Sequence, residues 1–98
     1  MNTRAKGVQF ERKVARAFEK AGCEVRGLES GGDHLVISRD GILIASECKN
    51  QARLQLPTWW RQAKADAVKS SMPTLTFNLA GEMLTLMRTA DLLKLVSR

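Results

Sequence analysis

The sequence contains little of what several classes of protein require. Its two cysteines, Cys23 and Cys48, lie far apart and form no Cys-x-x-Cys pair, so neither a zinc site nor a disulfide framework is expected. No apolar run approaches the roughly 20 residues of a membrane span. The charged N-terminus lacks the apolar stretch of a signal peptide, and the chain has no internal repeat. We therefore expect an intracellular protein whose two thiols stay reduced and buried.

Acidic residues are scarce relative to basic ones. Ten aspartates and glutamates stand against 16 lysines and arginines, which gives a formal net charge of +6 at pH 7. This surplus favours a polyanionic partner, first nucleic acid and second an anionic membrane surface. A merely basic protein without such a partner is the alternative. A length of 98 residues predicts one domain, 1–98, with a modest core that a partner subunit would help to stabilise.

Hydrophobic periodicity predicts the order helix, three strands, helix, two strands, helix. The Asp40-Gly41 pair predicts a hairpin turn, and Met72-Pro73 is expected to end the second helix. This order predicts an α/β fold in which helices flank a mixed sheet. We expect helices over 3–21, from Pro57-Thr58 to about 70, and after a Thr89 cap, with strands over 23–28, 33–38, 42–48, 74–79 and 83–88.

Two acidic residues and a lysine are expected to meet at the ends of neighbouring strands. Residues two apart in a strand point to the same face, so Glu47 and Lys49 project together while Cys48 faces the other way. Asp33 begins the preceding strand, and antiparallel pairing around the predicted turn places it within a residue or two of Glu47. Two neighbouring carboxylates can share a divalent cation.

A third acid, Glu11, borders the apolar face of the first predicted helix. An acid in that position is costly unless it has a partner, and a helix packed on the sheet could direct Glu11 toward Asp33 and Glu47. A cation held by such carboxylates activates water and neutralises charge on a scissile phosphate. A nearby lysine can orient the water or stabilise the transition state.

Each of these residues also has a plainer interpretation. Glu47 and Lys49 could form an ordinary exposed ion pair, and Asp33 could be a turn residue after two glycines. Glu11 could be a solvated helix acid beside Arg12. Their joint placement in one pattern favours a metal-dependent nuclease over three separate coincidences.

Three segments carry this pattern in one order: Lys6–Arg12 (KGVQFER), Ser30–Asp33 (SGGD) and Glu47–Asn50 (ECKN). With them the chain resembles the PD-(D/E)xK nuclease superfamily, and within it the archaeal-type Holliday junction resolvases and related small phage nucleases. The resemblance covers about residues 4–80. It implies a restriction-endonuclease-like αβββαβ core with a mixed central sheet flanked by helices.

The resemblance also implies roles for individual residues. His34, which follows Asp33, departs from the family pattern, and we favour a structural or DNA-contacting role for it. The implied cofactor is Mg²⁺, with Mn²⁺ expected to substitute. The implied catalytic residues are Glu11, Asp33, Glu47, Lys49 and Gln62. The implied metal ligands are the backbone carbonyl of Cys48 and the side chains of Asp33, Glu47 and Glu11.

Basic residues near these motifs are expected to bind DNA phosphates, which supply most non-specific affinity. For Lys13 and Lys20 a solvated helix face is the preferred interpretation. Of the adjacent Trp59 and Trp60, one is expected in the core, and the other against a base or a partner subunit. The expected DNA-binding residues are Arg4, Lys6, Arg12, Arg16, Arg53, Arg61 and Lys64.

These expectations favour a Mg²⁺-dependent, structure-selective endonuclease that resolves Holliday junctions in the cytoplasm of a bacterium, a phage-infected cell or an archaeon. Two symmetric cuts in branched DNA suit a homodimer, and the apolar last helix fits either a dimer interface or the core. The alternatives are a nickase, a restriction-type enzyme or an exonuclease of the same fold, a non-catalytic DNA-binding module, and a basic RNA-binding or membrane-surface protein. The acidic cluster counts against the last two.

Overall fold

The computed structural model of this chain describes residues 3–27 and 34–97, with side chains from Lys6 onward. The order of helices and strands is the predicted one. Among the described helices, none is long and apolar enough to cross a membrane. The helices are α1 (Thr3–Lys20), α2 (Leu56–Asp66) and α3 (Thr89–Val96), and the strands are β1 (Glu24–Gly27), β2 (His34–Ile37), β3 (Leu43–Lys49), β4 (Met72–Leu79) and β5 (Glu82–Met87).

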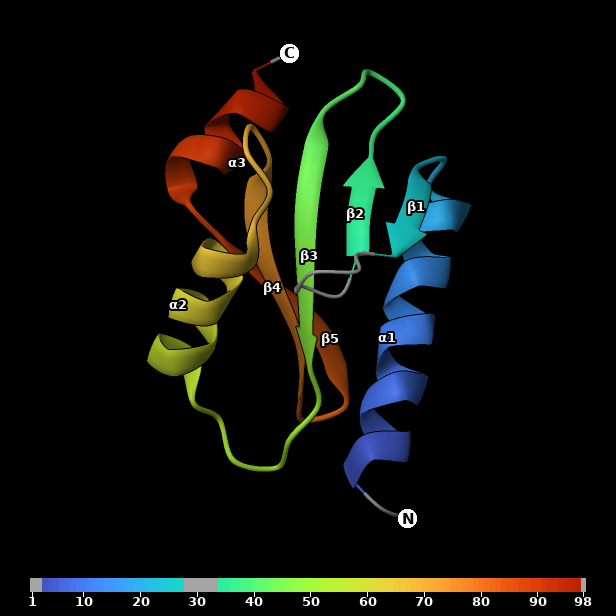
Figure 1. The fold of residues 1–98 in the computed structure, drawn as a ribbon, viewed down its shortest axis with the longest axis vertical. Helices are drawn as coiled ribbons and strands as arrows, with labels where there is room; N and C mark the ends of the chain where they lie inside the picture. The colour runs from blue at the N-terminus through green and yellow to red at the C-terminus, as the bar shows by residue number, and fades with distance from the viewer. Residues whose placement is uncertain (1–2, 28–33, 98) are drawn as a thin grey trace.

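The strands form one mixed sheet in the order β1-β2-β3-β4-β5. Neighbouring strands are antiparallel except β3 and β4, which are parallel because α2 supplies the crossover between them. Figure 1 shows α1 on one side of the sheet and α2 on the other. The chain therefore has the α/β, restriction-endonuclease-like architecture that the sequence predicted.

The two faces of the sheet carry separate apolar clusters, because successive side chains of a strand point to opposite faces. On the α2 face, Trp59 and Ala63 pack with Leu75 and Phe77 of β4. On the α1 face, the cluster is formed by Phe10, Val14 and Cys48. Trp59 is 4% exposed, which confirms that one of the two tryptophans lies in the core.

The end of α1 follows its sequence signal. Gly22 has φ +96°, a left-handed conformation that glycine adopts at low cost, and its N–H donates to the carbonyl of Glu19. The next N–H, of Cys23, donates to the carbonyl of Phe18, so carbonyls in the last turn of the helix are satisfied before β1 begins. The turn between β2 and β3 is also as predicted, with Gly41 at φ +84°.

The predicted end of the second helix is wrong. α2 ends at Asp66 rather than near residue 70, because Ala67 is extended and Ser70 adopts φ +70° in a turn. Met72-Pro73 does not terminate the helix but begins β4, where Pro73 pairs with β3. Proline is tolerated there because the pairing with β5 starts only at Thr74, so its missing N–H costs no hydrogen bond on that side.

The last helix, α3, also differs in detail from its prediction. Thr89 is the first helical residue and not the cap, because Arg88 occupies the cap position without a side-chain hydrogen bond. Three apolar residues of α3 are exposed and so do not belong to the core, while Leu95 is half-buried. Leu92, Leu93 and Val96 are 46%, 58% and 68% exposed, respectively.

Candidate active site

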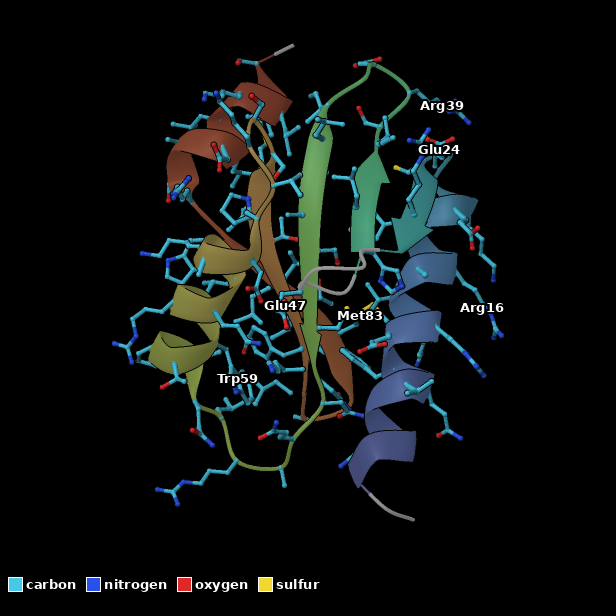
Figure 2. The ribbon with its side chains drawn as sticks, in the orientation of Figure 1. Arg16, Glu24, Arg39, Glu47, Trp59 and Met83 are labelled. Carbon is cyan, nitrogen blue, oxygen red and sulfur yellow. The ribbon has the colours of Figure 1, made fainter. Side chains whose placement is uncertain are left out.

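The centre of the candidate site is the carboxyl end of β3. Glu47 is 5% exposed, and its Oε1 lies 3.8 Å from the Nζ of Lys49. Glu47 pairs with Leu75 and Lys49 with Phe77 across the parallel ladder. Because paired residues share a face, the acid and the lysine both lie on the α2 face of the sheet. Figure 2 shows Glu47 and Trp59 between α2 and β3.

The burial of this pair sets it apart from an ordinary surface ion pair. The side chain of Glu47 is 6% exposed and that of Lys49 is 21% exposed. Burying a carboxylate carries a desolvation penalty, which a partner at ion-pair distance offsets only in part. The exposed-pair alternative is therefore wrong, and the pair occupies a position where an apolar pair would be at least as stable.

The neighbouring strand β2 carries the residue next to the predicted Asp33. His34 pairs with Ser46 in the antiparallel ladder, and Ser46 directly precedes Glu47. The His34 side chain therefore shares the face of Ser46, which is opposite to that of Glu47. Its Nδ1 is buried, and no hydrogen-bond partner is found for it in the described part of the chain. Asp33 itself lies outside the described residues.

Glu11 and Cys48 belong to the α1 side of the sheet. Phe10 and Val14 of α1 pack against Cys48, whose side chain points away from Glu47 as predicted. Glu11, next to Phe10, is half-buried. The structure thus holds Glu11 at the α1–sheet boundary and Glu47 on the other face. The role of Glu11 as a third acid of the site stays a prediction.

The second helix brings further predicted residues near the α2 face. Gln62 is exposed and precedes the buried Ala63, so it lies beside the packed stripe of α2 without being part of it. Trp60 is half-buried, and the Nζ of Lys64 lies 5.9 Å from the centre of its ring. This contact anchors Lys64 by a cation–π interaction. Gln62 as a catalytic residue stays a prediction.

The basic residues expected to bind DNA surround these elements. Figure 2 shows Arg16 on the outer side of α1, pointing away from the sheet. Arg4 lies in α1 ahead of the described side chains. The predicted residues come from α1, from the loop before α2 and from α2 itself. The exposed members of the predicted set are Lys6, Arg12, Arg16, Arg53, Arg61 and Lys64.

A comparison with protein-family models identifies the chain. The model described as "Archaeal holliday junction resolvase (hjc)" matches residues 2–67. This match spans more than half of the sequence. The chain belongs to the archaeal Holliday junction resolvase family. Comparisons with curated proteins and with solved structures found no match.

The family match covers the segments that carry the candidate site. The matched region runs from the start of α1 to the end of α2, so it contains all three segments that suggested the family. It also contains Glu47 and Lys49, while β4, β5 and α3 lie beyond it. The family is one of nucleases that act on DNA.

The described residues supply only part of the metal-ligand set predicted from the sequence. Among residues 3–27 and 34–97, no group of three His, Cys, Asp or Glu side chains could hold a metal ion. The resolvase-type ligand set predicted from the sequence includes Asp33, which lies outside these ranges. The described part of that set consists of the carboxylates of Glu47 and Glu11 and the backbone carbonyl of Cys48.

Proposed function

We propose that this chain is a metal-dependent endonuclease that hydrolyses phosphodiesters in branched DNA and resolves Holliday junctions. The observation that carries the proposal is the buried Glu47 carboxylate held 3.8 Å from Lys49 in a chain of the resolvase family. A buried ion pair that lowers the stability of the fold is typical of a catalytic site, because function there requires groups that are unfavourable to bury.

The donor set suits a hard divalent cation. The carboxylate oxygens of Glu47 and the carbonyl oxygen of Cys48 are neighbours along β3, and oxygen donors are what Mg²⁺ prefers. Asp33 and Glu11 would complete the set, and Mn²⁺ is expected to substitute. When bound, Mg²⁺ would supply Lewis acidity that activates water and neutralises charge on the scissile phosphate.

The register of the sheet supports a role for Asp33. Asp33 immediately precedes His34 in the sequence. His34 is paired with Ser46, the residue before Glu47. If this antiparallel pairing continued by one residue, Asp33 would lie opposite Glu47, as expected for two ligands of one cation.

Lys49 has the task of stabilising the reacting phosphate. Its ammonium group is held near Glu47 and keeps partial access to solvent, at 21% side-chain exposure. From this position it can orient the attacking water and offset the charge that develops on the phosphate oxygens. Glu47 limits the motion of Lys49, and the surrounding basic residues bind flanking phosphates, which positions the strand for attack.

We further infer that the enzyme acts as a twofold dimer. Two symmetric cuts in a four-way junction require two active sites, and a twofold axis relates them most simply. The exposed Leu92, Leu93 and Val96 of α3 offer an apolar surface that a second copy would cover.

The test is cleavage of a labelled four-way junction, linear duplex and single-stranded DNA in Mg²⁺. The wild type is compared with Asp33→Ala and Lys49→Ala, and the matched control is Lys69→Ala, an exposed lysine before β4. Paired nicks in the junction alone, lost in both site variants and kept in the control, are the expected result.

Other outcomes separate the parts of the proposal. Equal cutting of all three substrates would retain the nuclease and remove the junction preference. Binding without cutting of any substrate at any Mg²⁺ or Mn²⁺ concentration would refute the enzymatic function and leave a DNA-binding module.

A further inference from the structure

A hollow opens on the α1 face of the sheet, just past the end of β3. We call it the amide hollow, because three of its polar lining residues are amides. Its volume is about 220 Å³, room for about seven waters at ~30 Å³ each, so a hydrated phosphate group fits. The polar residues that line it are Lys6, Gln9, Lys13, Asn50 and Asn78.

The lining has the chemistry of an anion site. Two ammonium groups and three side-chain amides face the hollow, and the described residues that line it include no carboxylate. Lys6, Gln9 and Lys13 are spaced i, i+3 and i+7 along α1, so they form one stripe of the helix. Ammonium and amide N–H groups donate hydrogen bonds to phosphate oxygens.

The two asparagines come together through the parallel pairing of β3 and β4. Lys49 pairs with Phe77, and Asn50 and Asn78 are the next residues of each chain segment. An adjoining hollow is also lined by Lys6, Asn50 and Asn78, so these three residues border both hollows. The turn beside it contains Gly81 at φ +83°, a left-handed conformation that glycine adopts at low cost.

The location relates the amide hollow to the proposed active site. Asn50 directly follows Lys49, but even-numbered residues of β3 face α1 whereas Lys49 faces α2. The hollow therefore lies across the strand end from the proposed catalytic pair. A DNA strand with its reacting phosphate at Lys49 would pass this point with a neighbouring phosphate.

We propose that the amide hollow binds a non-scissile phosphodiester of the DNA strand that is cut. This inference rests on the proposed function and adds Gln9, Lys13, Asn50 and Asn78 to the binding surface. It also replaces the expectation that Lys13 belongs to a merely solvated helix face. The site holds the strand in the ground and transition states alike, so its loss raises KM and leaves kcat nearly unchanged.

Binding measurements on non-cleaving protein test the proposal. Dissociation constants for a four-way junction and a short duplex are measured over a range of KCl concentrations in the Glu47→Gln background. Lys13→Ala should weaken binding about 5- to 10-fold near 0.1 M salt and reduce the slope of log K against log salt by about 0.9. Asn78→Ala should weaken binding without changing the slope, because an amide displaces no counterion. Lys20→Ala, an exposed lysine of the same helix outside the hollow, should leave the slope unchanged.

Nuclear magnetic resonance gives a readout that needs no substitution in the hollow. In Glu47→Gln protein, the side-chain NH₂ signals of Gln9, Asn50 and Asn78 should shift when duplex DNA is added. Inorganic phosphate at a matched phosphate concentration should shift them far less. A larger response to inorganic phosphate than to DNA would overturn the assignment in favour of a free-phosphate site.

The two proposals fail in different ways. If the wild type cuts junctions while Lys13→Ala retains the full affinity and salt slope, the amide hollow is refuted and the nuclease stands. If the wild type cuts no DNA but the amide signals and the salt slope respond as expected, the hollow stands as a DNA-phosphate site and the nuclease is refuted.

Discussion

β3 and β5 flank the same strand, β4, yet they differ in almost every physical respect. β3 is buried continuously from Ile44 to Cys48, because α1 packs on one of its faces and α2 on the other. β5 is an edge strand in which Glu82, Met83, Thr85 and Leu86 are exposed. Glu82 in β5 is solvated and carries no desolvation penalty. The buried Glu47 in β3 carries such a penalty, which a partner must offset. Burial, and not residue type, therefore distinguishes a candidate catalytic acid from a surface acid.

The largest expected effect comes from exchanging these two acids for their amides. Glu47→Gln should lower the cleavage rate about 100- to 1000-fold, the size of effect seen when a preorganised charged or polar group is removed from a transition state. Its free energy of unfolding should change by no more than about 1 kcal/mol, because Lys49 retains access to water. Glu82→Gln should cut within about threefold of the wild type. Full activity in Glu47→Gln would remove Glu47 from the site.

The second prediction concerns apolar burial in the same two strands. Ile44→Ala in β3 should lower the free energy of unfolding by about 3 kcal/mol, since the side chain is 9% exposed and its loss leaves a cavity. Leu86→Ala in β5 should cost about 1 kcal/mol or less, because Leu86 is 36% exposed. Urea unfolding of both variants measures the difference, and equal costs would show that β5 is covered in solution.

The third prediction concerns a hydrogen bond that links β5 to the buried interior. The Oγ1 atoms of Thr76 and Thr85 lie 2.9 Å apart, and Thr76 is 1% exposed. Thr85→Val should destabilise the protein by about 1 kcal/mol, because the buried Thr76 hydroxyl loses its partner. The double variant with Thr76→Val should recover part of that loss. A double-mutant cycle of thermal unfolding without any coupling would contradict the bond.

The smallest expected effect lies in the turn that joins β4 to β5. Ala80 has φ +52°, a left-handed conformation that alanine adopts at a cost and asparagine more readily. Ala80→Asn should raise the free energy of unfolding by about 0.5 kcal/mol. The contrasting variant Gly81→Ala, at φ +83°, should lower it by about 1 kcal/mol. Urea midpoints that moved in the opposite order would show that the turn adopts another geometry.

Much of the fold followed from local signals in the sequence. The apolar spacing of Phe10 and Val14, together with Gly22, predicted the first helix and its end, and Asp40-Gly41 predicted the hairpin. The end of α2 could not be predicted, because it depends on the start of β4. Met72-Pro73 resembles a helix stop in isolation, but pairing with β3 draws both residues into the sheet.

The candidate site was predictable in part for the same reason. The alternation of β3 placed Glu47 and Lys49 together, since their separation of two residues fixes a common face. Their burial was not predictable, because it depends on α2 and β4. No local signal in the sequence indicated that Asn50, Asn78 and Lys13 line one hollow.

The sequence by itself determined the identities and order of the elements, the resolvase family, the surplus of positive charge, and the shared face of Glu47 and Lys49. These properties depend on residue type and on short spacings, which a strand or helix converts directly into direction. Only the tertiary structure decided that this pair is buried, that α1 and α2 cover opposite faces, and that lysines and amides from three segments line one hollow. Those facts depend on which surfaces meet, and contacts between distant segments are fixed by the packing of the whole chain.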